Sequence, residues 1–126
     1  MVSKVAEQGL VARWRDLLAR YSTVFTALEC RLQERHSIGV SEFEALEWLA
    51  TCGQRCRGAD LVEAVHLSQS ATSRLVARLE RERLVERAMC EKDRRAIFVN
   101  LTEAGRQRYR EAKPTHLAVL EELLAE

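Results

Sequence analysis

Residues 66–80, HLSQSATSRLVARLE, and residues 90–105, CEKDRRAIFVNLTEAG, decide the fold. In the first stretch, Ser68 is the expected N-cap of a helix that runs from Gln69 to about Glu82, because a serine hydroxyl can accept a hydrogen bond from the first helical turn. Apolar residues recur on one side of this helix at four-residue steps. The opposite side carries hydroxyls, an amide and flanking arginines, and such short polar groups let a helix approach a groove closely.

The second stretch predicts a β-hairpin with a basic tip. Residues 84–89 and 96–101 read as strands, and the connection CEKDRR is polar enough to form their turn. Residues 74–110 hold eleven Arg or Lys against six Asp or Glu, whereas the remainder holds nine against thirteen. This asymmetry is typical of a nucleic-acid footprint, although a solvated basic face would give the same count.

The rest of the chain reads as helices. Ser41 is expected to open one, with Glu44 completing a capping box, and residues 59–65 predict a short one. Thr102 is expected to cap a later helix, which Pro114 should interrupt. The N-terminal third predicts one long helix with an apolar stripe that a helix of a second copy would cover: Leu10, Trp14, Leu17, Leu18, Tyr21, Phe25, Leu28 and Leu32.

Composition excludes several classes of protein. The 126 residues are 47% hydrophobic and 31% charged, a globular balance that suits one domain with a helical extension. Because the chain has neither an apolar signal region nor a membrane-length run, we expect a cytoplasmic protein. It has no Gly-rich phosphate loop and no nucleophile with an evident base, so we expect neither catalysis nor a cofactor.

The order of elements predicts a winged helix-turn-helix, mainly α with a small β-hairpin wing. Three regions are expected: an N-terminal dimerisation helix (1–36), the winged helix-turn-helix (37–101) and C-terminal dimerisation helices (102–126). The polar-faced helix can enter a major groove, and the basic tip can reach the DNA backbone or the adjacent minor groove.

LSQSATSRLVARLE, LVER and DRRAIFVNLTEAGR, in this order and spacing, resemble the MarR-type (multiple antibiotic resistance) transcriptional regulators over residues 60–106. The resemblance implies a homodimer that binds a pseudo-palindromic operator in double-stranded DNA, most often as a repressor. It also implies a small aromatic or phenolic effector, held between the dimerisation helices and the DNA-binding lobe by residues of the first, second and fifth helices.

The resemblance also assigns roles to single residues. Asp93 and Arg95 match the D-x-R wing motif, in which the acid orients the arginine that enters the minor groove, with Lys92 and Arg94 as nearby phosphate contacts. Arg78 flanks the polar face of the helix and is added as a DNA contact. The DNA-contacting part of the recognition helix matches Ser68, Gln69, Ser70, Thr72, Ser73 and Arg74.

Two positions depart from the family pattern. Many relatives have Gly where this chain has Arg83, so we expect the end of the recognition helix to close differently from theirs. The chain stops at Glu126, whereas relatives usually continue through a longer final helix. Either a trimmed dimer interface or a missing natural C-terminus would account for this.

The cysteines leave alternatives open. Cys52 and Cys56 flank one loop and Cys90 begins the wing, so a thiol switch could act on DNA binding, and release from DNA could follow either effector binding or thiol oxidation. The spacing lacks the paired ligands of a zinc site, and reduced cysteines without a role are the default expectation. The alternative functions are a cysteine-based redox-sensing repressor and a winged-helix module for protein–protein contact without specific DNA binding.

Overall fold

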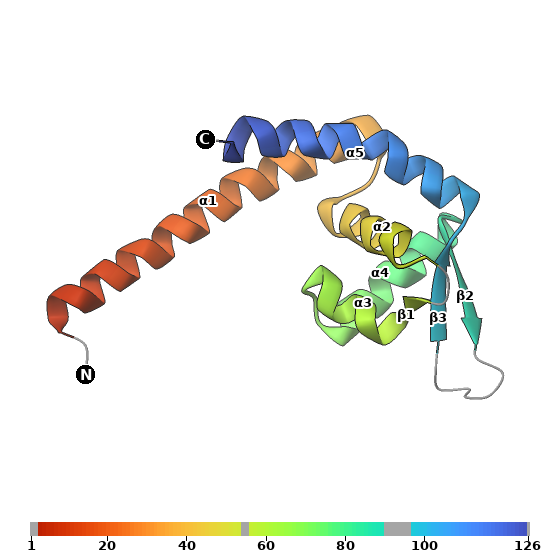
Figure 1. The fold of residues 1–126 in the computed structure, drawn as a ribbon, viewed down its shortest axis with the longest axis horizontal. Coiled ribbons are helices and arrows are strands. Elements are labelled where there is room, and N and C mark those ends of the chain that lie inside the picture. Colours follow the sequence, from red (N-terminus) through yellow and green to blue (C-terminus); the bar gives the residue numbers. More distant parts are fainter. Residues whose placement is uncertain (1–2, 54–55, 90–96, 126) are drawn as a thin grey trace.

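The computed structural model describes residues 3–53, 56–89 and 97–125 of the chain. In these ranges it has five helices and one three-stranded antiparallel sheet (Figure 1), so the prediction of a mainly helical winged helix-turn-helix is confirmed. None of the described helices is long and apolar enough to cross a membrane. The elements are α1 (Lys4–His36), α2 (Val40–Cys52), β1 (Cys56–Arg57), α3 (Gly58–Val65), α4 (Gln69–Arg81), β2 (Val85–Met89), β3 (Ile97–Leu101) and α5 (Glu103–Leu124).

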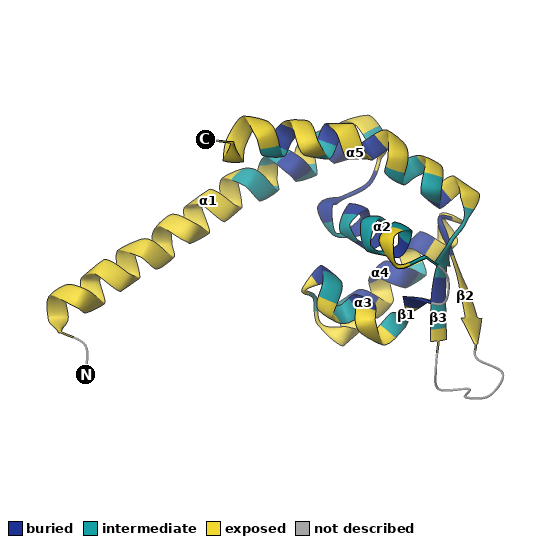
Figure 2. Ribbon diagram, viewed as in Figure 1, coloured by how far each residue is buried: buried dark blue, intermediate teal, exposed yellow. Residues whose placement is uncertain are grey.

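The long N-terminal helix, α1, forms as predicted and extends away from the rest of the chain (Figure 1). Ser3 caps it, because its hydroxyl accepts a hydrogen bond from the Ala6 N–H at 3.2 Å. Only near its C-terminal end does α1 contribute buried side chains, Leu28 and Leu32. Most of its length is exposed (Figure 2), including the apolar residues Leu10, Trp14, Leu17, Leu18 and Tyr21.

The C-terminal helix, α5, lies against the last turns of α1 (Figure 1). Arg108 donates a hydrogen bond to the carbonyl oxygen of His36 at 3.0 Å, and the His36 ring lies 2.7 Å from the Thr115 hydroxyl. The prediction that Pro114 interrupts this helix is wrong, because α5 continues through it. Buried residues on both sides of the proline, Ala112 and Val119 among them, hold the helix in place despite the missing backbone donor.

The second helix, α2, begins at Val40, so the prediction of a capping box opened by Ser41 is wrong. Gly39 is the N-cap and has no side chain with which to cap. The Glu29 carboxylate of α1 instead accepts the Val40 N–H at 3.1 Å, and a negative charge at this end also suits the helix dipole. Glu29 of α1 thus caps the start of α2 in place of the predicted local capping box.

The core lies where α2 meets α5 and the helix-turn-helix. Phe43 of α2 is fully buried and stacks on the His116 ring of α5 with centroids 4.3 Å apart. Its ring also lies 5.6 Å from that of Tyr109. The largest fully buried aliphatic and aromatic side chains come from all five helices, from β2 and β3, and from the connection between α1 and α2. They are Leu32, Ile38, Phe43, Leu46, Leu49, Leu61, Leu79, Val85, Val99 and Val119.

The sheet has the order β1-β3-β2. Strands β2 and β3 form the predicted hairpin, with Val85 opposite Leu101 and Met89 opposite Ile97. Strand β1 was missed, because the stretch CGQRCRG reads as a loop when taken alone. It pairs with β3 through Cys56 opposite Val99, and a two-residue strand carries too little sequence signal to be found locally.

The turn between α4 and β2 corrects the expectation drawn from Arg83. Arg83 has φ +62°, so the helix does close in the left-handed conformation that usually falls to glycine. The Leu84 N–H donates to the Leu79 carbonyl at 2.9 Å, and the Arg83 N–H donates to the Glu80 carbonyl at 3.0 Å. These two bonds form a Schellman motif, which holds the arginine in a backbone conformation it does not favour.

The same turn receives the start of α5. The Thr102 hydroxyl donates to the Arg83 carbonyl at 2.7 Å and accepts the Gly105 N–H at 3.0 Å, so it caps α5 as predicted. The Thr102 N–H donates to the Leu84 carbonyl at 3.1 Å. Gly105 packs so closely on this carbonyl that a Cβ at position 105 would collide with its oxygen.

We predict that Arg83→Gly stabilises the protein. The substitution relieves a left-handed non-glycine residue, and the free energy of unfolding measured in urea should rise by about 0.5–1 kcal/mol. Arg81→Gly is the matched control, because it removes the same charge from a right-handed helical position and should lower this free energy by about 1 kcal/mol. Equal effects of the two substitutions would contradict the prediction.

We predict that Gly105→Ala destabilises the protein by about 1–3 kcal/mol, because the added methyl group has no space beside the Leu84 carbonyl. Gly9→Ala is the control, because nothing lies within 4 Å of a Cβ built at this exposed position in α1. It should leave the protein as stable or more stable by up to about 1 kcal/mol. Thermal unfolding of both variants separates the steric effect from helix propensity.

Candidate nucleic-acid interface

Helix α4 presents a face of short polar side chains to solvent. The Ser68 hydroxyl caps the helix by accepting the Ala71 N–H at 3.1 Å and lies 3.3 Å from the Ser70 hydroxyl. Helical periodicity then buries Leu75, Val76 and Leu79 and leaves the opposite side free. The predicted contact residues on that exposed side are Ser68, Gln69, Ser70, Ser73, Arg74 and Arg78.

Thr72 does not belong to this face, although it was expected among the DNA contacts. Its side chain is only 3% exposed, and its hydroxyl donates to the Ser68 carbonyl at 2.9 Å. The hydroxyl is therefore used inside the helix and is not free for a base. Its role is to support the first turn of α4 from the buried side.

Arg78 of α4 forms an ion pair with a residue of α2. Its guanidinium is 3.2 Å from the Glu42 carboxylate of α2, and the side-chain exposures are 57% for the arginine and 6% for the acid. The second carboxylate oxygen of Glu42 is buried and has no hydrogen-bond partner in the described part of the chain. Arg78 therefore compensates a buried negative charge while the rest of its guanidinium reaches solvent.

The wing extends beside α4. Glu80 of α4 and Arg87 of β2 form an ion pair at 3.4 Å, which joins the recognition helix to the hairpin. Met89 and Ile97, the last described pair toward the tip, are 63% and 41% exposed. The predicted tip residues, Lys92, Asp93, Arg94 and Arg95, lie outside the residues that the structure describes.

A groove of about 370 Å³ lies between α3, α4 and the sheet. Gln69 and Ser73 line one side, and Arg57 of β1 and Arg87 of β2 line the other. Arg57 is exposed. The sequence did not identify it as a candidate, because the stretch that contains it reads as a loop and nothing in that stretch indicates a position beside α4. The groove brings Arg57 and Arg87 next to the polar face.

A second hollow, of about 510 Å³, lies between the lobe of α2 and α3 and the C-terminal helix. Burial raises the pKa of Glu44, and the Glu47 charge raises it further. Burial also lowers the pKa of His116, so its neutral form is favoured. Residues of α2, α3 and α5, together with His66 just after α3, form its walls: Glu44, Glu47, Trp48, Thr51, Ala64, His66, Tyr109, Lys113 and His116.

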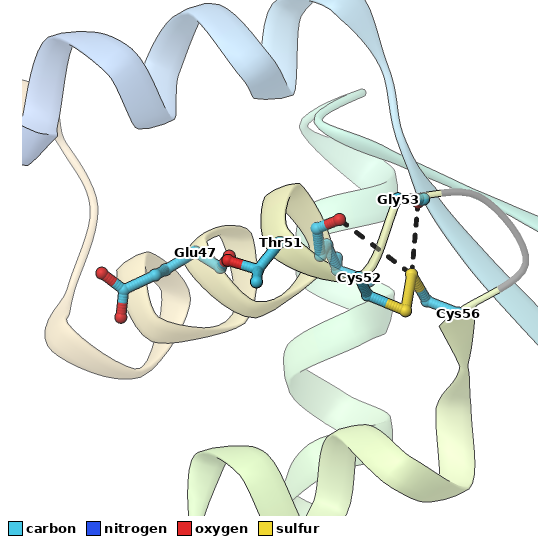
Figure 3. The surroundings of a disulfide bond; sticks show 6 residues. Glu47, Thr51, Cys52, Gly53 and Cys56 are labelled. Atoms are coloured by element: carbon cyan, nitrogen blue, oxygen red, sulfur yellow. Dashed lines mark hydrogen bonds between the residues drawn. A yellow bond between two sulfur atoms is a disulfide. The ribbon is translucent and has the colours of Figure 1, made fainter.

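Two of the cysteines are joined. Cys52 and Cys56 form a disulfide (Figure 3), which corrects the default expectation that these thiols are reduced. Cys30 is exposed, and its thiol donates to the Glu34 carboxylate at 3.5 Å, a hydrogen bond that raises the pKa of Cys30. Cys90 lies outside the described residues. Among the residues that the structure describes, no group of His, Cys, Asp and Glu could hold a metal ion.

Comparisons with known proteins agree with this geometry. A family model described as the MarR family matches residues 36–96. The uncharacterised HTH-type transcriptional regulator YwhA of Bacillus subtilis (strain 168) is 39% identical over 51 residues, which are 40% of this chain and 37% of that protein.

Two solved structures from Streptomyces coelicolor are similar over nearly the whole chain. The MarR family transcriptional regulator AbsC is 28% identical with a TM-score of 0.83, covering 98% of this chain and 81% of its own. The MarR family transcriptional regulator Sco3205, solved in complex with DNA, is 27% identical with a TM-score of 0.85, covering 98% and 76%.

We predict that Arg78→Ala destabilises the fold as well as changing the polar face. Glu42 would remain buried without its partner, and the free energy of unfolding should fall by about 1–2 kcal/mol, a value reduced by the exposure of the arginine. Adding Glu42→Gln should recover much of this loss, because a neutral amide costs less to bury. Arg74→Ala, which removes a charge from the same face, should change stability by less than about 0.5 kcal/mol.

Proposed function

Because the chain belongs to the MarR family of winged helix-turn-helix transcriptional regulators, we propose that it binds a pseudo-palindromic operator as a homodimer and represses transcription. The observation that carries this proposal is the exposed face of α4, where Gln69, Ser70 and Ser73 lie between arginines. Side chains of this length let the helix approach base edges in the major groove. The family groups regulators and not enzymes, so no catalytic role is proposed.

Specific recognition depends on the helix, and most of the affinity comes from phosphates. Arg57 and Arg74 lie beside the polar face and supply positive charge on the described surface, whereas Arg87 is paired with Glu80. We propose that Lys92, Arg94 and Arg95 add contacts from the wing, with Asp93 orienting Arg95. Such a protein releases condensed counterions when it binds, so its affinity falls steeply with salt. Double-stranded DNA as the partner also favours the cytoplasm as the proposed location.

The homodimer is supported by the apolar stripe on α1. Six large apolar side chains from Leu10 to Tyr21 are between 44% and 64% exposed in the single chain, which is unfavourable unless another surface covers them. A second copy related by two-fold symmetry would place both α4 helices in successive major grooves, about 34 Å apart. Residues 1–36 and 102–126 then form the proposed dimerisation regions, and residues 37–101 form the DNA-binding lobe.

We propose that the hollow between α2 and α5 holds the effector. Trp48 and Tyr109 supply aromatic walls, and Lys113 supplies a cation, which together suit a small aromatic or phenolic compound. The hollow touches both the DNA-binding lobe and the helix that packs on α1. A ligand there can favour one arrangement of these parts over another and so release DNA.

Selection from a randomised duplex library near physiological salt tests this function, with the mass of the protein measured in the same buffer. We expect a dimer and enrichment of an inverted repeat whose half-sites are centred about 10 base pairs apart. A dimer that enriches no sequence would contradict specific DNA binding and favour a winged-helix module for protein–protein contact. A monomer that enriches no inverted repeat would contradict the proposed homodimer.

Repeating the selection with Ser73→Ala locates the recognition surface. This variant should lose about 1 kcal/mol of preference at one position of each half-site and keep the salt dependence of the parent. Arg74→Ala is the control, because loss of a phosphate contact should weaken all sequences similarly and lower the slope of affinity against salt. A uniform loss with Ser73→Ala would exclude its role in reading bases.

A further inference from the structure

The disulfide between Cys52 and Cys56 connects the end of α2 to the edge strand of the wing. The two Cα atoms are 6.0 Å apart, and the residues are four positions apart in the sequence. Cys52 is exposed, whereas Cys56 is completely buried beneath the end of α2 (Figure 3). A thiol in solution can therefore reach the sulfur of Cys52 and not that of Cys56.

The buried sulfur also has partners for its reduced form. The Cys56 Sγ lies 3.3 Å from the Gly53 carbonyl oxygen and 4.0 Å from the Leu49 carbonyl oxygen (Figure 3). A reduced Cys56 can donate its hydrogen to one of these oxygens without leaving its place in the core. The same site thus accommodates the thiol and the disulfide, as a reversible pair requires.

The disulfide acts on an element that has few other restraints. Strand β1 consists of Cys56 and Arg57 alone, paired with Val99 and Phe98 of β3. Arg57 is followed directly by α3, for which it is the N-cap, and its side chain lines the groove beside α4. A change in the mobility of β1 would therefore affect three neighbouring features. These are the edge of the sheet, the start of α3 and the groove that Arg57 and Ser73 both line.

We infer that Cys52 and Cys56 form a dithiol–disulfide switch, in which the disulfide favours DNA binding and its reduction weakens it. This inference rests on the proposed DNA-binding function. The direction is opposite to release by oxidation, because the disulfide restrains the part of the winged helix-turn-helix that borders the recognition helix. If β1 is already restrained by the disulfide, it loses less conformational entropy when DNA binds. The oxidised form should therefore bind DNA more tightly than the reduced form.

The chemistry is thiol–disulfide exchange with a dithiol reductant. One thiolate of the reductant attacks the exposed Cys52 sulfur, which forms a mixed disulfide and breaks the bond to Cys56. Cys56 leaves as a thiolate and takes up a proton. The second thiolate of the reductant then attacks its own sulfur in the mixed disulfide and frees Cys52. Two electrons pass to the protein, and the reductant becomes a disulfide.

The experiment uses the full chain with Cys30→Ser and Cys90→Ser, so that only Cys52 and Cys56 remain. The protein is equilibrated with reduced or oxidised dithiothreitol, and alkylation by N-ethylmaleimide followed by mass measurement counts the free thiols. Affinity for the selected operator is then measured in both states. We expect the oxidised form to bind at least about fivefold more tightly, within the usual range of coupling between two sites. The added variant Cys52→Ser, at an exposed position, should bind like the reduced parent under both conditions.

Equal affinities in two states with verified thiol counts would overturn the inference, as would tighter binding by the reduced form. Backbone amide exchange at Cys56 and Arg57 provides a second readout that needs no DNA. It should be slower in the oxidised protein, and equal exchange would show that the disulfide does not restrain β1. If no operator is enriched in either state, the proposed function fails, and amide exchange still decides whether the disulfide restrains the strand.

Discussion

The turn at Arg83 and Leu84 is the constraint on which the rest of the DNA-binding lobe depends. Leu84 donates its N–H to the last turn of α4 and accepts the N–H of Thr102. The end of the recognition helix, both ends of the hairpin and the start of α5 therefore meet in one network of backbone hydrogen bonds. Gly105 is required there because only a hydrogen atom fits against the Leu84 carbonyl. The direction of the wing relative to α4 is set at this point.

Sequence patterns predicted the elements whose signals are local. Ser68 and Thr102 were identified as caps because the accepting hydroxyl lies three residues from the donating N–H. The hairpin followed from alternating apolar residues around a polar tip. The start of α2 was misplaced because its first N–H is satisfied by Glu29, on another helix. Strand β1 was missed because its partner lies more than forty positions away.

The same distinction holds for the candidate interface. The exposure of Gln69, Ser70 and Ser73 follows from helical periodicity and was predicted. The ion pair of Arg78 with Glu42 was not, because the two residues are 36 positions apart and neither shows a pattern that names the other. The position of Arg57 in the groove likewise depends on the strand that was missed. Contacts between residues far apart in the sequence therefore decide which arginines form ion pairs within the chain and which line the groove beside α4.

The unsupported length of α1 has a mechanical consequence. Its 33 residues span about 50 Å at the usual rise per residue, and only the last turns are fixed by α5 and α2. A rotation of one degree about that base moves the far end by almost 1 Å, by simple geometry on the length given by the helical rise. In the single chain, small changes of angle where His36 meets Thr115 would therefore become large displacements at the far end of α1, where the proposed second copy would pack.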